Sequence, residues 1–291
     1  MSRTDPNDTA VLVCTGLGLA IVAAGLLYVV QRDNAPPVTA VNAQTGLMSS
    51  SAALTTTGSV ERIDAELSEI GRTFIAANED AALDSLRAIV AAQTQVRESG
   101  AIDTDGDGVG EYAYLGELMG RATRTLDALE GEEEPPSFTV EPALLDPEFG
   151  TLTESARGIV LLRDGYAFQV HLPGPSDESD YDLYPGLPES GAAGVGGVGD
   201  EQLPDAVASA HAWVAYAWPL EHGRTGERAF FVDHDGVIAE CANEAGLYAG
   251  LERVPRPDAA LGSSDRGNLL AVPGWVSGSA CDGQDWTVLS R

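Results

Sequence analysis

The residues best suited to chemistry lie in one short acidic segment, Asp103-Thr104-Asp105-Gly106-Asp107-Gly108-Val109-Gly110-Glu111. Oxygen-bearing side chains stand at alternate positions and a glycine at the sixth, as in the first half of an EF-hand loop that turns sharply around a hard cation. We therefore expect this segment to bind calcium. Its predicted ligands are the carboxylates of Asp103, Asp105 and Asp107, the backbone carbonyl of Val109, and Glu111 directly or through water.

The segment departs from an EF-hand at the twelfth position, where Tyr114 replaces the bidentate glutamate. A bound ion would therefore be held with modest affinity and for a structural purpose. The alternative is an Asp-Gly turn at the end of a helix, with its charges solvated. Three aspartates within five residues repel one another unless a cation joins them, which favours calcium.

The chain is strongly acidic. Aspartate and glutamate number 45 against 16 basic residues, all of them arginine, and the formal net charge is −29. Such a balance argues against a nucleic-acid partner, which needs a basic surface, and against binding to anionic lipid. It favours solubility, cation binding or a saline environment. The alternative is an acidic bias of the whole genome, which would produce the same charge balance without a specific function.

No catalytic constellation is apparent in the sequence, and we expect a protein that is not an enzyme. The four histidines (His171, His211, His222 and His234) have no metal-ligand spacing such as His-Glu-x-x-His, and there is no Gly-x-Ser-x-Gly nucleophile motif. Carboxylates are so abundant that no glycosidase-like pair stands out.

One apolar run predicts a membrane anchor. Residues 10–30 carry no charge, and 21 helical residues span about 31 Å, the thickness of one hydrocarbon core. We expect a short N-terminal tail (1–9) and a single transmembrane helix (10–31). The alternative is a cleaved signal peptide, whose apolar core is normally only about 7–15 residues long.

The orientation of this anchor rests on the short tail and on the cysteines, because Arg3 and Arg32 flank the run symmetrically. Outside the run only Cys241 and Cys281 remain, and they could form a disulfide in an oxidising compartment. Two unpaired structural thiols are the alternative. We expect a single-pass cell-membrane protein whose C-terminal domain lies outside the cytoplasm, in a bacterial periplasm or at the cell surface.

The remaining chain predicts an α+β domain over 59–291, joined to the anchor by a Pro, Ser, Thr and Ala linker over 32–58. Apolar residues spaced three and four apart predict a long helix, or a helix pair, over 59–99. This stripe could pack on the protein's own sheet or form a coiled-coil dimer. A second helix is expected over 115–129, and a Gly/Pro-rich acidic insertion over about 173–206.

The strand signals fall in the second half of the chain. A hairpin is expected from two apolar runs joined by Arg163-Asp164-Gly165, followed by an antiparallel meander and an edge strand. The predicted strands are 158–162, 166–172, 212–220, 228–233, 237–241 and 286–289. A long helix packed on such a β-meander is an α+β roll.

Residues 75–89, Ile-Ala-Ala-Asn-Glu-Asp-Ala-Ala-Leu-Asp-Ser-Leu-Arg-Ala-Ile, resemble the stretch that follows the membrane half of the long helix in type IV pilin-like proteins and type II secretion pseudopilins. The resemblance covers about 70–125 and 156–240. It continues through the acidic glycine-rich loop, and through Phe230-Phe231-Val232-Asp233 and Gly236-Val237-Ile238.

The resemblance implies a pilin-like roll and a structural or assembly role in a pilus or type II secretion-like system. The expected partners of the protein are the membrane and other pilin-like subunits or secretion assembly proteins. Nucleic acid is not expected as a partner, because of the acidic charge. The prepilin peptidase motif Gly-Phe-x-x-x-Glu is absent, and the apolar run contains no carboxylate. The alternative is therefore a membrane-tethered binding or sensory domain that uses a pilin-like fold without assembling into a filament.

Overall fold

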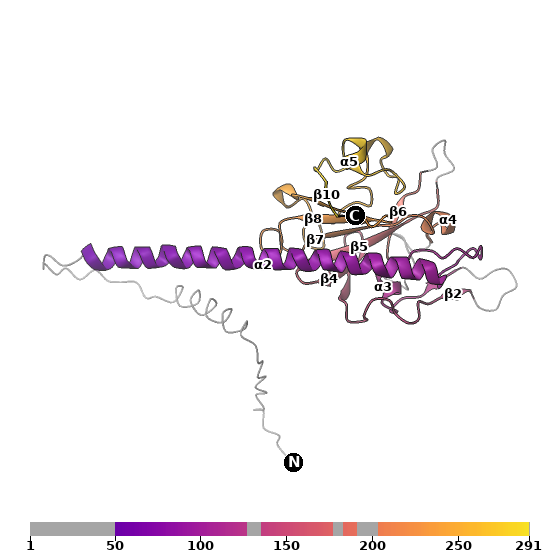
Figure 1. Cartoon of the computed structure of the whole chain (residues 1–291), viewed down its shortest axis with the longest axis horizontal. Helices are drawn as coiled ribbons and strands as arrows, with labels where there is room; N and C mark the ends of the chain where they lie inside the picture. Colours follow the sequence, from indigo (N-terminus) through magenta and orange to yellow (C-terminus); the bar gives the residue numbers. More distant parts are fainter. Residues whose placement is uncertain (1–49, 127–134, 177–182, 191–202, 291) are drawn as a thin grey trace, which may run out of the picture. The chain divides into compact units, whose positions relative to one another are not determined.

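The computed structural model of the protein describes residues 50–126, 135–176, 183–190 and 203–290 (Figure 1). The predicted tail, the predicted transmembrane helix and the linker up to residue 49 lie outside these ranges. Among the described helices, none combines the length and the apolar character that a membrane crossing requires. The chain from Ser59 to Arg291 forms one compact unit.

The long predicted helix is α2, Ser50–Ser99. It is a single helix, and it begins earlier than the predicted residue 59. Residues 50–58, predicted from the sequence to belong to the linker, therefore belong to this helix. These residues contain no proline, and Pro36-Pro37 lie too far upstream to stop the helix. The helix ends where predicted, because Gly100 adopts the left-handed conformation (φ 62°) that closes many helices.

Among the described side chains of α2, those before Ile75 are exposed, and the rest of the unit covers the helix beyond them. Leu86, Ile89 and Val96 are fully buried, whereas Phe74 is 63% exposed. Leu67 and Ile70 are exposed as well. The described part of the predicted apolar stripe is thus only partly covered.

The sheet is antiparallel, in the order β10-β9-β8-β7-β5-β4-β3, with β6 paired to β5. Its strands are β3 Thr151–Ser155, β4 Gly158–Arg163, β5 Tyr166–Pro173, β6 Gly186–Pro188, β7 Val214–Pro219, β8 Ala229–Asp233, β9 Ile238–Cys241 and β10 Thr287–Ser290. The predicted hairpin, meander and edge strand are confirmed. An α+β arrangement, with a helix followed by an antiparallel sheet, is therefore shown.

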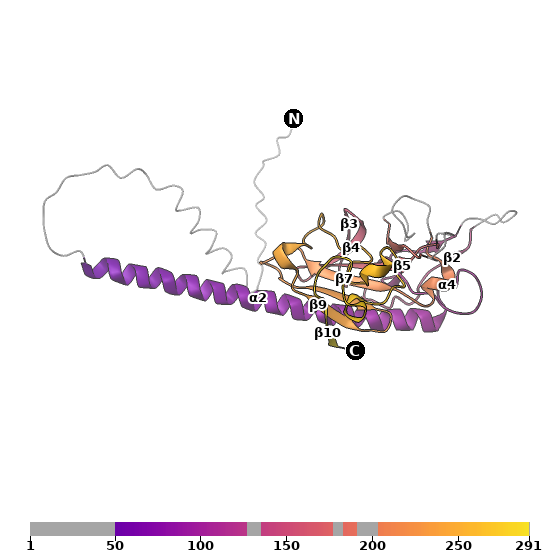
Figure 2. The ribbon, with the colours of Figure 1, turned by 90° about the horizontal axis from the view of Figure 1, so that it is seen from above.

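The sheet separates two hydrophobic cores. One face, with Phe168, Val170 and Phe230, packs against α2. The opposite face packs against the C-terminal segment around Tyr248, Leu261 and Trp286. In Figure 1, α2 crosses the sheet with β7 and β8 above it and β4 below it, and the short helix α5 (Gly274–Ser277) lies at the top; Figure 2 shows the unit from above. Because both faces are covered, every residue of β5 is buried.

Three further parts of the fold differ from the predictions. The helix expected over 115–129 is only the four-residue α3, Leu115–Leu118, since Gly120 turns the chain at φ 64°. The chain then forms β1 (Arg124–Thr125), within the range of that predicted helix, and β1 pairs with β2 (Ser137–Phe138). Within the predicted insertion, β6 joins the sheet, and α4 (Ala206–Ser209) follows it. The C-terminal segment also contains the 3-10 turns η1 (Glu244–Gly246) and η2 (Ser263–Asp265).

Candidate metal centre

The acidic segment forms a closed loop directly after α2. Its base is held by a hydrogen bond of 2.8 Å from the Glu111 amide to the Ile102 carbonyl. Gly110 lies so close to the end of α2 that a Cβ atom there would stand 2.1 Å from the Arg97 carbonyl oxygen. A residue with a side chain at position 110 would therefore clash with the end of α2, and glycine allows the loop to pass the helix at this point.

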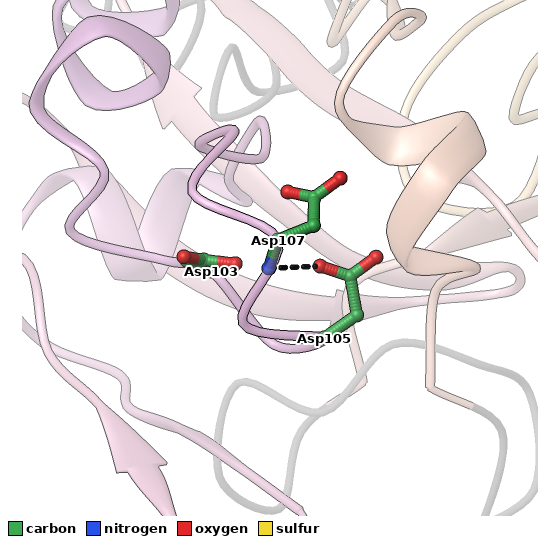
Figure 3. A group of neighbouring side chains, drawn as sticks. All are labelled: Asp103, Asp105 and Asp107. Carbon is green, nitrogen blue, oxygen red and sulfur yellow. Dashed lines mark hydrogen bonds between the residues drawn. The ribbon is translucent and has the colours of Figure 1, made fainter.

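The loop brings three of the predicted ligands together. Carboxylate oxygens of Asp103, Asp105 and Asp107 lie within 4.8 Å of one another (Figure 3). Gly106, between Asp105 and Asp107, and Gly108, directly after Asp107, have φ of 71° and 85°, a region that other residues rarely adopt. The side chains curl toward their own backbone, with Asp105 accepting from the Asp107 amide at 3.1 Å and Asp103 from the Gly108 amide at 3.1 Å.

These oxygens fit a hard cation. Oδ1 of Asp103 is buried and has no hydrogen-bond partner among the described residues, an expensive state for a carboxylate oxygen unless something positive lies against it. Calcium takes six to eight oxygen ligands. Three carboxylates would supply part of that shell, and backbone carbonyls and water would supply the rest. Val109 follows the group, and its amide donates to Asp107 at 2.7 Å, while its carbonyl as a ligand stays a prediction.

Glu111 is not part of this group, and its role as a ligand, directly or through water, stays a prediction. Its side chain is 1% exposed. One carboxylate oxygen accepts hydrogen bonds from the amide and the hydroxyl of Thr104, and the other lies 2.7 Å from Arg124 Nη1. Glu111 therefore ties the acidic loop to the buried interior.

Arg124 is the centre of this interior network. Its guanidinium also donates to Glu117 through Nε at 3.0 Å and through Nη2 at 2.8 Å, and to the Tyr112 carbonyl. Burial alone would lower the pKa of Arg124, but the charges and hydrogen bonds of Glu117 and Glu111 raise it. A buried arginine shared by two carboxylates holds the loop, α3 and β1 in one arrangement.

A third buried carboxylate, Glu189, adjoins this network. It accepts from the amide of Gly116, where a Cβ atom would stand only 2.2 Å from Glu189 Oε1. Desolvation by burial, with a contribution from the negative Glu117, raises the pKa of Glu189 to about 8. Glu189 is therefore largely protonated at neutral pH.

A second ionic contact joins α2 to the sheet. Glu79, 5% exposed, accepts from Arg228 Nε at 2.8 Å and from the amides of Glu227 and Arg228 at 3.0 Å each. Arg228 also pairs with Glu240 of β9. Burial would raise the pKa of Glu79, but the hydrogen bonds and charge of Arg228 together with the backbone donors lower it. The sequence offered no signal from which this contact could be predicted.

The predicted disulfide is absent from the structure, since Cys241 and Cys281 are both free and buried. The thiol of Cys281 donates to the Gly262 carbonyl at 3.4 Å, whereas Cys241 belongs to the core on the face of the sheet away from α2. Burial raises the pKa of Cys241 to about 12 and that of Cys281 to about 11. The alternative of two structural thiols describes what is observed.

The four histidines do not meet at a metal-binding cluster among the described residues, where Asp103, Asp105 and Asp107 form the group found. His171 lies fully inside the sheet on β5, and its ring packs edge-on to Tyr216. Burial, aided by the charge of Arg157, lowers the pKa of His171 to about 3, so the ring is neutral.

Comparison with known proteins adds no family. A scan against protein-family models finds no match, and searches among curated proteins and among solved structures find none.

Proposed function

We propose that this chain is a membrane-anchored, extracytoplasmic, pilin-like structural or assembly protein whose acidic loop binds calcium. The observation that supports this most is the division of α2 into a covered and an uncovered half. Large apolar side chains at Leu67, Ile70 and Phe74 follow the helical spacing of three and four, and all are exposed. A helix with such a face suits packing against another helix, as expected of a pilin-like subunit.

The covered half of α2 is built to stay in place. The ion pair between Glu79 and Arg228, the residue before β8, fastens this half to the sheet. Leu86, Ile89 and Val96 are fully buried against the sheet. The acidic loop leaves the end of the same helix, so a calcium ion there would fix the direction in which the chain departs. The role of the ion is therefore structural.

Site-specific photo-crosslinking in the membranes of the native host tests this proposal. A photo-reactive phenylalanine analogue at Phe74 should give crosslinked species larger than the single chain. The matched control places the same group at Ala76, which is exposed on the opposite side of α2. Crosslinking from Phe74 and not from Ala76 is expected. Absence of crosslinks from both positions in intact membranes would contradict an assembly role.

A second candidate is a membrane-tethered binding or sensory domain that does not assemble. The observation that favours it is a cavity lined by three arginines in an otherwise acidic protein. In that case crosslinks from Phe74 would be absent, and ligand binding would be the measurable activity.

A further inference from the structure

A cavity of about 270 Å³ lies between the turn after β3, the approach to β6 and the C-terminal segment. Its lining includes Arg157, Arg256, Arg266, Asp258, Pro257 and Leu269. It involves none of the residues of the acidic loop. No residue of α2 lines it, so the proposed assembly role and the calcium loop do not use it.

The charge of this lining is opposite to that of the protein. Three of the chain's 16 arginines meet here with one carboxylate, although acidic residues outnumber basic ones 45 to 16 overall. Asp258, 6% exposed, is already occupied, since Oδ1 lies 3.3 Å from Arg256 Nε and Oδ2 accepts from the Gly267 amide at 2.9 Å. The Asp258 carboxylate therefore helps to position Arg256 in the lining. The three arginines still outnumber this one carboxylate, so the lining has a net positive charge.

The three guanidinium groups keep donors for a ligand. Arg256 uses its Nε for Asp258, and Arg266 uses one terminal nitrogen for the Cys281 carbonyl at 3.2 Å. The guanidinium of Arg157 has no hydrogen bond or ion pair within the described residues. Each guanidinium carries five N–H groups in a planar fork, so several remain available.

The walls of the cavity are fixed by buried contacts. The hydroxyl of Tyr216 donates to the Pro257 carbonyl and accepts from the Ala260 amide, both at 3.0 Å. On the other side the Leu269 amide donates to the Tyr184 carbonyl at 2.8 Å. Because these walls are already ordered, a ligand would lose little affinity in shaping its site.

We propose that this cavity binds a small doubly charged oxyanion, either phosphate or a small phosphate monoester. Guanidinium forks match the oxygens of a phosphate group in pairs. The excess of two positive charges over Asp258 suits a dianion better than a single carboxylate or chloride. Pro257 and Leu269 offer an apolar wall to the organic part of a monoester.

Calorimetric titration of the full-length chain with inorganic phosphate, at constant ionic strength, tests the proposal. Arg157→Gln is the central variant, because Arg157 has no described partner whose loss could unfold the protein. Arg266→Gln is the second variant. The matched control is Arg72→Gln on the exposed side of α2, which makes the same change in net charge.

We expect the wild type and Arg72→Gln to bind phosphate equally. Each cavity variant should bind about tenfold or more weakly, as the loss of one charge-assisted hydrogen bond predicts. The melting temperature of each variant without phosphate establishes that it is folded. No binding by the wild type at about 10 mM phosphate, a concentration that would reveal even weak binding, would overturn the proposal. A loss of affinity in Arg72→Gln equal to that of the cavity variants would overturn it as well. Methyl phosphate in place of phosphate should bind at least as well if the apolar wall takes part.

Discussion

The guanidinium of Arg124 lies 2.7 Å from the carboxylate of Glu111, and both side chains are 1% exposed. This pair links the acidic loop, through Thr104, to α3 and β1. Removing one member of a buried ion pair leaves the other charge without compensation, at a cost of about 3–5 kcal/mol.

We therefore expect Arg124→Met to lower the free energy of unfolding by about 3–5 kcal/mol. Urea unfolding of the chain from Ser59 onward, a compact unit with its own cores, measures this. Arg87→Met is the control, because Arg87 forms an exposed pair with Asp84 on α2, and such pairs contribute at most about 1 kcal/mol. Equal losses in the two variants would contradict the buried network.

Glu189 predicts a pH dependence of stability. Its folded pKa of about 8 lies above the ordinary value of 4.5. The folded state thus keeps a proton that the unfolded state loses, and the stabilisation is complete below about pH 4.5 and is lost as the pH rises through 8. The slope of the unfolding free energy should be about −1.4 kcal/mol per pH unit between these values. In Glu189→Gln this slope should disappear, and an unchanged slope would place the titration elsewhere.

Glu79 predicts the opposite dependence, because its folded pKa is lowered. Its contribution is present above the ordinary pKa and is lost as the pH falls through the lower, folded value. At neutral pH we expect Glu79→Gln to lower the unfolding free energy by about 2–3 kcal/mol, since charge-assisted hydrogen bonds from Arg228 and two amides weaken. Hydrogen exchange should then rise in the covered half of α2 first. Exchange that rises equally in β3 would argue against a local fastening of the helix.

The buried thiols predict a simple count. The sequence contains three cysteines, and the structure has Cys241 and Cys281 free. With pKa values raised to about 12 and about 11, both thiols should react slowly with iodoacetamide in the folded protein at pH 8. Denaturation without reductant should then release three reactive thiols. A count of one would show that Cys241 and Cys281 form the disulfide after all.

The sequence predicted those parts of the fold that carry a long apolar signal. The apolar stripe of α2 repeats every three and four residues, the strands β4, β5, β7 and β8 are continuous apolar runs, and the turn at Arg163-Asp164-Gly165 has its own residue signature. Short strands such as β1 and β6 are too brief to carry such a signal. They depend on their partners, β2 and β5, which become neighbours only once the chain has folded.

At the site, local spacing brought Asp103, Asp105 and Asp107 together correctly, because the three residues lie within one turn of the chain. Local spacing gave no sign of the contact between Glu111 and Arg124, which are thirteen residues apart. The same limit applies to Glu79 and Arg228, separated by 149 positions. A single sequence carries no record of such distant pairs.

The binding of calcium by Asp103, Asp105 and Asp107 is the claim on which the site depends, and thermal melting of the chain from Ser59 onward tests it most directly. With an affinity near 10⁻⁴–10⁻³ M, about ten times the dissociation constant of calcium should stabilise the fold by ~1.4 kcal/mol, or roughly 3–5 °C. Asp105→Asn, which keeps an oxygen acceptor for the Asp107 amide, should lose this response. Asp80→Asn on exposed α2 should retain it. Equal melting temperatures in millimolar calcium and in chelator, for wild type and both variants alike, would contradict the site and leave a solvated turn.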